Sequence, residues 1–208
     1  MTAPDPRHHW DGVYGRRAST EVSWYESEPT QSLELISAAQ LPPAAPIIDV
    51  GGGASLLVDR LLARGHTDVT VLDLSGEVLT QVETRLGALR RHVTLIQRDI
   101  RAFMPSRCYA LWHDRAVFHF LTDPQDRAHY RAALLAGTAP GSHVVMATFG
   151  PQGPTRCSGL DTCRYDADSL AKELGAPFQL AESRLADHVT PSGGHQQFLY
   201  ARFVQAPG

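Results

Sequence analysis

The feature of this sequence that most constrains its fold is a regular alternation of short apolar runs with segments of helical periodicity. The run Ile47–Val50 is typical of a strand and stops at three glycines, and residues 56–62 then repeat leucine and valine at helical spacing until Gly65. The apolar runs are short and nearly continuous, as expected for strands that are buried on both faces. Strands that alternate with helices need crossover connections, so the sequence predicts an α/β fold with a doubly wound, mostly parallel sheet.

The same alternation continues along the chain without an internal repeat or a shift in composition. A length of 208 residues suits one domain. We expect this domain to span residues 29–208, after an irregular, aromatic-rich segment at residues 1–28. Further strands are predicted at residues 69–74, 93–97, 109–113, 142–149, 178–183 and 197–204, and helices at residues 30–39, 77–89, 125–135 and 167–174.

Charge and composition exclude several classes of protein. Nineteen Lys and Arg against 22 Asp and Glu give a formal net charge of −3, which argues against a nucleic-acid partner because such binding usually depends on a basic face. No stretch approaches the ~18 apolar residues of a membrane helix, and the N-terminus lacks the apolar part of a secretion signal. The cysteines Cys108, Cys157 and Cys163 are odd in number and lack zinc-type spacing. The sequence therefore predicts a cytoplasmic protein without a metal site or a membrane partner, and it gives no indication of the oligomeric state.

Acidic residues stand at the carboxyl ends of three successive predicted strands. Asp49 lies two residues before Gly51, Asp73 ends the second strand, and Asp99 follows the third. Ligands of open parallel sheets bind at this edge. The dinucleotide pattern lacks its third glycine because Leu56 stands there, and no Gly-Lys-Ser or Gly-Lys-Thr of a nucleotide-binding loop follows. Three carboxylates suit a ligand that has ribose hydroxyls, an exocyclic amine and a positive charge.

Taken in order, these motifs resemble those of the class I S-adenosylmethionine-dependent methyltransferases. Residues 47–55 (IIDVGGGAS) resemble the family's first motif, residues 71–74 (VLDL) the acidic end of its second strand, residues 97–100 (QRDI) its adenine-side motif, and residues 109–115 (YALWHDR) its fourth strand and active-site end. The resemblance covers residues 47–149. It implies a Rossmann-like sheet of seven strands whose last two form an antiparallel hairpin, S-adenosylmethionine as the cofactor, and methyl transfer as the activity.

The resemblance also implies how the cofactor would be held. The glycine turn would carry the methionine moiety, Asp73 would accept hydrogen bonds from the ribose hydroxyls, and Asp99 with Ile100 would face the adenine edge. The expected cofactor-binding residues are Asp49, Gly51, Gly52, Gly53, Ser55, Asp73, Leu74, Asp99, Ile100, His113 and Trp24.

Polar residues follow the fourth predicted strand, where an acceptor substrate would sit. His113, Asp114, Arg115 and His119 are the expected catalytic residues. His113 or His119 could take a proton, Arg115 could hold a substrate anion, and Asp114 could orient either of them. The alternative interpretation is that Asp114 and Arg115 cap the following turn and that His119 packs in the core with its neighbouring phenylalanines.

The N-terminal aromatic residues Trp10, Tyr14, Trp24 and Tyr25 are similar to the lead-in of small methyltransferases that act on thiols, tellurite-type anions or protein lysines. There the lead-in closes over cofactor and substrate, so residues 1–28 are expected to form a lid. The alternative is that these rings only cover an apolar edge of the sheet. Two further histidines, at positions 188 and 195, are expected in a loop that could reach the mouth of the site.

The nature of the methyl acceptor depends on whether a base is present. A thiol, with a reference pKa of about 8.5, ionises readily, whereas an alcohol or an ammonium group needs a positioned base. No strong-base motif is evident, so the sequence favours a small-molecule acceptor with a thiol or another heteroatom nucleophile. The alternatives are a protein lysine in an open acidic groove and a module that binds the cofactor without turnover. The Asp/Asn-Pro-Pro-aromatic motif of enzymes that methylate base amino groups is missing after the fourth strand.

Overall fold

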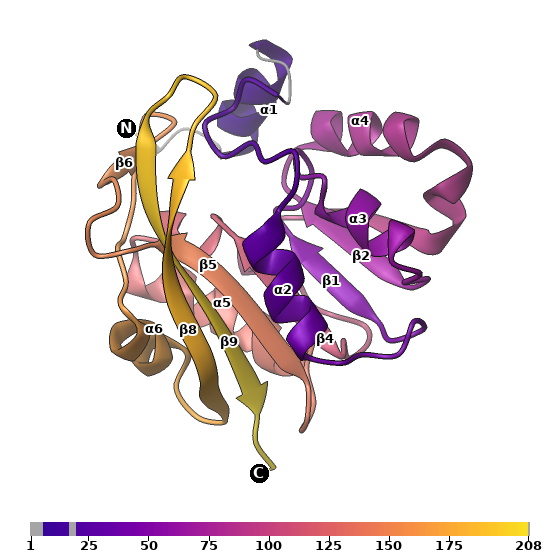
Figure 1. Cartoon of the computed structure of the whole chain (residues 1–208), viewed down its shortest axis with the longest axis vertical. Helices are drawn as coiled ribbons and strands as arrows, with labels where there is room; N and C mark the ends of the chain where they lie inside the picture. The colour runs from indigo at the N-terminus through magenta and orange to yellow at the C-terminus, as the bar shows by residue number, and fades with distance from the viewer. Residues whose placement is uncertain (1–5, 17–19, 208) are drawn as a thin grey trace.

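The computed structural model describes residues 6–16 and 20–207, which form a seven-stranded sheet between two layers of helices (Figure 1). The strands of this sheet are β1 (Ile47–Val50), β2 (Val69–Asp73), β3 (Val93–Gln97), β4 (Leu111–Arg115), β5 (His143–Phe149), β8 (Phe178–Val189) and β9 (His195–Gln205). Their order is β3-β2-β1-β4-β5-β9-β8, in which β3 to β5 run parallel and β9 pairs antiparallel with both β5 and β8. The predicted doubly wound α/β fold with an antiparallel C-terminal hairpin is confirmed.

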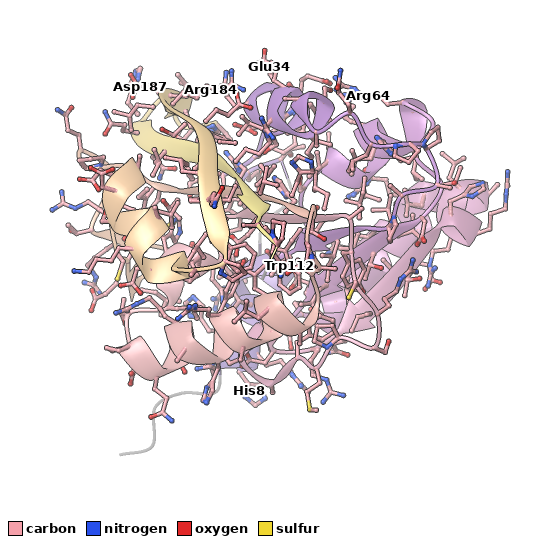
Figure 2. All side chains as sticks on the ribbon, turned by 90° about the horizontal axis from the view of Figure 1, so that it is seen from below. His8, Glu34, Arg64, Trp112, Arg184 and Asp187 are labelled. Carbon is pink, nitrogen blue, oxygen red and sulfur yellow. The ribbon has the colours of Figure 1, made fainter. Side chains whose placement is uncertain are left out.

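Helices cover both faces of the sheet. On one face lie α2 (Thr30–Ala38), α3 (Leu57–Ala63) and α4 (Gly76–Leu86), and on the other lie α5 (Pro124–Ala136) and α6 (Ala167–Leu174) (Figure 1). Each face has its own cluster of buried apolar side chains. Trp112, labelled in the interior in Figure 2, lies on the α5 face, where its indole N–H donates a 3.0 Å hydrogen bond to the Tyr130 hydroxyl. Strands β1 and β2 are buried along their whole length, which explains their nearly continuous apolar sequence.

The carboxyl ends of the parallel strands meet at one edge of the sheet. The chain runs outward from β1 to β3 in one direction and from β4 to β5 in the other, so a crevice lies between β1 and β4. Two short 3-10 helices, η2 (Ile100–Ala102) and η3 (Phe118–Phe120), follow β3 and β4 at this edge, whereas η1 (Gly87–His92) follows α4. Strand β4 lies two residues later than predicted, which places both His113 and Arg115 on the strand itself.

The prediction that the N-terminal segment is irregular was wrong for residues 6–16 and is confirmed for residues 20–28, which form turns and bends. Residues Pro6–Arg16 form α1, which lies across the end of the sheet (Figure 1). Its two glycines, Gly12 and Gly15, weaken its own helix propensity. Contacts with α4 stabilise it instead, since the Ser75 hydroxyl donates a 2.5 Å hydrogen bond to Asp11 and the Tyr14 side chain is buried. The sequence of α1 alone therefore carries little helical signal.

The closing strands are longer than predicted. Strand β8 runs on to Val189 and β9 begins at His195, so His188 and His195 lie on strands and not in a loop. The added residues 184–189 mix apolar and polar types, and of these only His188 is buried, so they lack the continuous apolar pattern of a strand buried on both faces. The Arg184 guanidinium on β8 forms a 2.7 Å ion pair with Glu34 on α2, and the two side chains lie close together in Figure 2.

The segment between β5 and α6 contains a small hairpin that was not predicted, formed by β6 (Arg156–Cys157) and β7 (Leu160–Asp161). Across residues 6–16 and 20–207, no helix is both long enough and apolar enough to cross a bilayer. Within the same residues, no group of three or more His, Cys, Asp or Glu side chains is arranged to hold a metal ion.

Candidate active site

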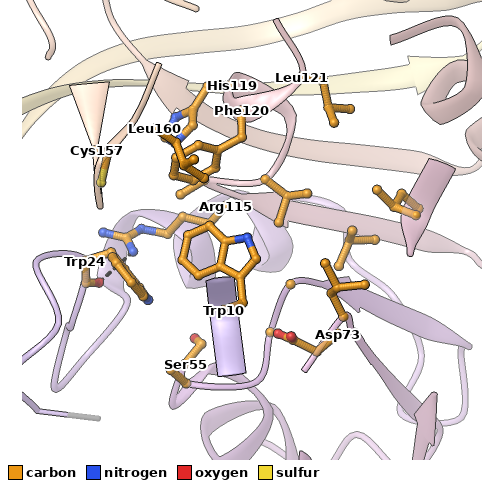
Figure 3. Close-up of a pocket in the computed structure, with 18 of the residues that line it drawn as sticks. Trp10, Trp24, Ser55, Asp73, Arg115, His119, Phe120, Leu121, Cys157 and Leu160 are labelled. Atoms are coloured by element: carbon orange, nitrogen blue, oxygen red, sulfur yellow. Dashed lines mark hydrogen bonds between the residues drawn. The ribbon is translucent and has the colours of Figure 1, made fainter. Parts of the chain in front are cut away.

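A cavity of about 390 Å³ opens at the carboxyl ends of β1, β2 and β4, which is within the roughly 300–1,000 Å³ typical of small-molecule sites. Figure 3 shows Asp73 and Ser55 on one side of it, His119 and Cys157 on the opposite side, and Trp10 between them. We call the side lined by Asp49, Asp73 and Asp99 the carboxylate half. We call the side lined by Trp10, Trp24, Phe120, Phe149, Phe198 and Leu160 the ring half.

The turn after β1 brings backbone close to Asp49. Its Oδ1 accepts a 2.7 Å hydrogen bond from His113 Nδ1, and its buried Oδ2 has no hydrogen-bond partner among the described residues. A Cβ atom on Gly52 would lie 2.2 Å from this Oδ2. Gly51 has a φ of +68°, and a Cβ there would lie 2.1 Å from Val117 Cγ2. Both glycines are therefore required for this turn.

Asp73, at the end of β2, is held rigidly at the cavity wall. Its two carboxylate oxygens accept hydrogen bonds from the backbone N–H groups of Ser75 (2.9 Å) and Gly53 (3.2 Å). Burial raises the pKa of Asp73 to about 6, against the opposing effect of these hydrogen bonds and with a smaller contribution from the charge of Asp49. The free directions of a carboxylate in this position suit a pair of hydroxyl donors.

Asp99 follows β3 and is bound to Arg101, a cavity residue that sequence reasoning missed. The Arg101 guanidinium donates to both oxygens of Asp99, with a shortest distance of 2.6 Å, and also reaches Asp126 at 3.0 Å. Burial alone would raise the pKa of Asp99, but the hydrogen bonds from Arg101 outweigh it and lower this pKa. Asp99 is thus an anion that already has a cationic partner. Since Asp126 lies on α5, no local sequence pattern reveals this triad.

Most of the expected cofactor-binding residues meet at this cavity. Its wall contains Asp49, Gly51, Gly52, Ser55, Asp73, Leu74, Asp99, Ile100, His113 and Trp24. Gly53 is not part of the wall. It supports Asp73 from behind, where a Cβ would lie 2.8 Å from the carboxylate Oδ2.

His113 lies in the cavity wall, with both ring nitrogens engaged. Nδ1 bonds Asp49, and Nε2 lies 2.9 Å from the Ser32 hydroxyl on α2. The ring is buried between these partners. His113 therefore orients Asp49, and it has no ring nitrogen left over to take a proton from an acceptor. Ser32 was another residue that sequence reasoning missed.

Asp114 is not among the residues that line the cavity. Its carboxylate accepts hydrogen bonds from the backbone N–H groups of Val117 (3.0 Å) and Phe118 (3.3 Å). Burial raises the pKa of Asp114 to about 6, although a hydrogen bond from the Tyr130 hydroxyl acts in the opposite direction. This geometry is that of the alternative interpretation, in which Asp114 caps the turn after β4.

Arg115 lines the ring half, and its guanidinium is bound to other parts of the chain. Nη1 donates to the Trp24 carbonyl (2.8 Å, the dashed line in Figure 3), Nε donates to the Tyr200 hydroxyl (3.1 Å), and Nη2 forms a 2.9 Å ion pair with Glu26. The guanidinium carbon lies 4.9 Å from the centre of the Phe198 ring. Arg115 therefore fastens the segment around Trp24 to strands β4 and β9.

His119, on η3, is fully buried and stacks on Phe149 with ring centres 4.2 Å apart. Its Nδ1 accepts a 3.2 Å hydrogen bond from the Phe149 backbone N–H, which leaves the proton of the neutral ring on Nε2. Burial and the charge of Arg115 lower the pKa of His119 to about 3. The ring is therefore uncharged near neutral pH and is a weak base.

The N-terminal rings reach over the cavity. Trp10, Tyr14, Trp24 and Tyr25 all line it, and the Trp10 ring centre lies 5.2 Å from Phe120 and 5.7 Å from Trp24. The rings of α1 thus meet those of η3. Residues 1–5 and 17–19 of the expected lid lie outside the described residues, and closure of residues 1–28 over bound molecules stays a prediction.

Part of the chain is similar to known proteins. Residues 47–141 match the family described as a methyltransferase domain. A mouse (Mus musculus) protein named eEF1A lysine and N-terminal methyltransferase is 27% identical over 122 residues, which are 57% of this chain and 17% of that protein. The chain thus spans only a small part of that relative.

Solved structures resemble the chain over nearly its full length. The structure described as conversion of a disulfide bond into a thioacetal group during echinomycin biosynthesis has a TM-score of 0.77 at 15% identity and covers 97% of this chain and 92% of its own. The 1,6-didemethyltoxoflavin-N1-methyltransferase of Burkholderia thailandensis has a TM-score of 0.69 at 19% identity and covers 97% and 84%. The glycopeptide N-methyltransferase MtfA with bound S-adenosylmethionine has a TM-score of 0.61 at 19% identity and covers 85% and 94%. At these identities the likeness concerns the fold.

Proposed function

We propose that this chain is a class I S-adenosylmethionine-dependent methyltransferase that transfers a methyl group to a small molecule, with a thiol or another heteroatom as the nucleophile. The match of residues 47–141 to a methyltransferase domain supports this proposal. When bound, the cofactor supplies a methyl group on a positively charged sulfur. The observation that carries the proposal is a single cavity that joins a carboxylate half to a half lined by rings. The carboxylate half suits a nucleoside with a cationic side chain, and the ring half suits an organic acceptor.

The carboxylate half fits the cofactor by its charge and its shape. The oxygens of Asp73 suit the ribose hydroxyls, and the buried Oδ2 of Asp49, which has no hydrogen-bond partner among the described residues, suits the cationic amino group of the methionine moiety. The close turn at Gly51 and Gly52 leaves room beside these carboxylates that a Cβ atom would fill. Asp99 already has a strong partner in Arg101, so we assign the adenine contact to the backbone of Ile100 beside it.

The ring half supports a small acceptor over a protein lysine. The mouse relative is named for lysine and N-terminal methylation, and a lysine acceptor would need an open acidic groove. In this chain Glu26 is paired with Arg115, and Trp10 and Trp24 line the cavity across from Phe120. The disulfide-to-thioacetal and toxoflavin structures are named for small-molecule substrates, which favours the same interpretation here.

Catalysis in such a site consists mainly of alignment and exclusion of water. The rings keep water from the acceptor, Asp49 and Asp73 fix the cofactor half, and Arg115 holds the covering segment in place. His113 is engaged by Asp49 and Ser32 and His119 is a weak base, so neither is suited to deprotonate an acceptor. A nucleophile that needs little help with its proton, such as a thiol, therefore fits best.

A transfer screen with labelled S-adenosylmethionine tests this proposal. The acceptors are thiols, phenols, amines, carboxylates and intact proteins, and binding of S-adenosylhomocysteine is measured in parallel by calorimetry. We expect the cofactor product to bind and the label to appear in a small thiol or a related nucleophile. Label in proteins alone would favour the lysine alternative. Binding without any transfer would indicate a cofactor-binding module.

A further inference from the structure

The ring half has a continuous aromatic wall that is built from distant parts of the chain. The Trp10 ring lies 5.2 Å from Phe120, and the Phe149 ring lies 4.9 Å from Phe198. His119 joins the two pairs, with ring centres 4.6 Å from Phe120 and 4.2 Å from Phe149. Trp10, Trp24 and Phe120 are partly exposed, so a flat apolar molecule can pack against their faces, whereas His119, Phe149 and Phe198 are buried and support them.

The cation of this wall, Arg115, is already neutralised. Its ion pair with Glu26 is 2.9 Å long, and its other nitrogens bond Trp24 and Tyr200. Burial alone would raise the pKa of Glu26, but hydrogen bonds and charge from His188 and Arg115 outweigh it and lower this pKa, so the carboxylate stays ionised. A substrate anion would have to displace the partly buried Glu26 from Arg115 and leave it with His188 as its remaining ion-pair partner, which is unfavourable.

His119 adds no charge to the wall. Its Nδ1 is bonded by the Phe149 N–H, and its burial beside Arg115 disfavours the protonated ring. A cationic acceptor would likewise lose its hydration against the rings, and the carboxylates beside them, Glu26 and Asp161, are already paired with Arg115 and Arg156. Both signs of charge are therefore disfavoured in the ring half as the structure describes it.

We propose that the ring half takes an uncharged acceptor that carries an aromatic ring, and that Arg115 acts there as a positioning residue which holds Trp24 against this acceptor. The inference rests on the proposed function and narrows it to one class of acceptor. The sequence alone suggested that Arg115 binds a substrate anion, and the proposal replaces this role with that of a positioning residue.

Three probes with the same skeleton and the same thiol nucleophile test the proposal. These are benzyl mercaptan, which is uncharged, para-(mercaptomethyl)benzoate, which is anionic, and para-(mercaptomethyl)benzylamine, which is cationic. Binding is followed at pH 7 by tryptophan fluorescence in the presence of S-adenosylhomocysteine, because Trp10 and Trp24 line the cavity. We expect benzyl mercaptan to bind about 100-fold more tightly than either charged probe, because each charged probe loses hydration without gaining a free partner of opposite charge.

Variants separate the roles of the residues. Phe120→Ala is expected to weaken binding of benzyl mercaptan about tenfold, as the loss of packed ring area predicts. Arg115→Met is expected to raise the KM of benzyl mercaptan more than it lowers kcat, while the order of the three probes stays the same. His129→Ala, at an exposed position on α5, is the control and should bind all probes as the wild type does.

Tight binding of the benzoate that is lost in Arg115→Met would overturn the proposal, because Arg115 would then be an anion receptor. Failure of benzyl mercaptan to bind while S-adenosylhomocysteine binds would also overturn it and would leave the cofactor assignment intact. Absence of S-adenosylhomocysteine binding would count against the proposed function itself. Thermal unfolding of each variant shows whether a loss of binding is a loss of the fold.

Discussion

Asp73 gives the sharpest test of how the cavity holds a ribose. If Asp73 accepts two charge-assisted hydrogen bonds from the ribose as proposed, Asp73→Ala removes both, and we expect S-adenosylhomocysteine to bind more weakly by about 1.5–3 kcal/mol, or roughly 10- to 150-fold. The stability of the protein should change much less. The variant leaves the N–H groups of Ser75 and Gly53 without their acceptors, but it also removes a buried charge.

The pKa of Asp73 gives the size of the stabilisation that follows from removing its buried charge. A rise from 3.8 to about 6 means that the ionised carboxylate destabilises the fold by about 3 kcal/mol at pH 7. Since this folded-state pKa is raised, the cost is present above pH 6 and disappears as the pH falls towards 3.8. Removing this charge in Asp73→Ala therefore stabilises the fold by an amount similar to the cost of the two unpaired N–H groups, which is about 1–3 kcal/mol each. The two effects have opposite signs and largely cancel.

The same pKa predicts how cofactor binding depends on pH. Below about pH 6 the carboxylate of Asp73 becomes protonated and loses one acceptor site, so affinity for S-adenosylhomocysteine should fall by up to about tenfold per pH unit. Calorimetry from pH 5 to pH 8 measures this. This fall in affinity below pH 6 should be absent in Asp73→Asn. It should remain in Asp114→Asn, because Asp114 has a similarly raised pKa but does not line the cavity. Wild-type affinity that is constant across this range would refute the ribose assignment.

Other expectations follow from single contacts. Trp10→Ala removes a ring that spans the cavity, so KM for the acceptor should rise about tenfold in steady-state assays, and an unchanged KM would show that α1 is not part of the site. Gly52→Ala places a methyl group 2.2 Å from Asp49 Oδ2, so both thermal stability and cofactor affinity should fall, and wild-type values would show that the turn can relax. Trp112→Phe removes the donor to a buried hydroxyl and should cost about 1–3 kcal/mol in urea unfolding, whereas a cost near zero would mean that this bond contributes little.

The central sheet could be predicted closely from the sequence. The predicted bounds of β1, β3 and α6 are those observed, because strands buried on both faces and a helix between clear end signals have strong local patterns. Strand β8 was predicted too short because it is the edge strand of the sheet, where polar side chains are tolerated and the apolar pattern of a buried strand is not required.

Roles within the site were harder to predict because they depend on partners far apart in the chain. Arg115 stands beside Asp114 in sequence, yet its partners Trp24, Glu26 and Tyr200 come from both ends of the chain. Helix α1 likewise forms through contacts with α4, and its own sequence carries little periodicity. Sequence position located these residues near the cavity, but only the folded contacts show what each of them touches.

The division of the cavity into two halves follows the order of the chain in part. The carboxylates come from the ends of β1, β2 and β3, whereas Phe120, Phe149 and Phe198 come from residues after position 117, on η3, β5 and β9, and Trp10 and Trp24 come from the N-terminal segment. Substitutions at cavity residues after position 117 are therefore expected to change which molecule is methylated without changing the affinity for the methyl donor. Hybrid proteins that exchange this part of the chain between relatives should inherit the acceptor of one parent and keep the donor affinity of the other.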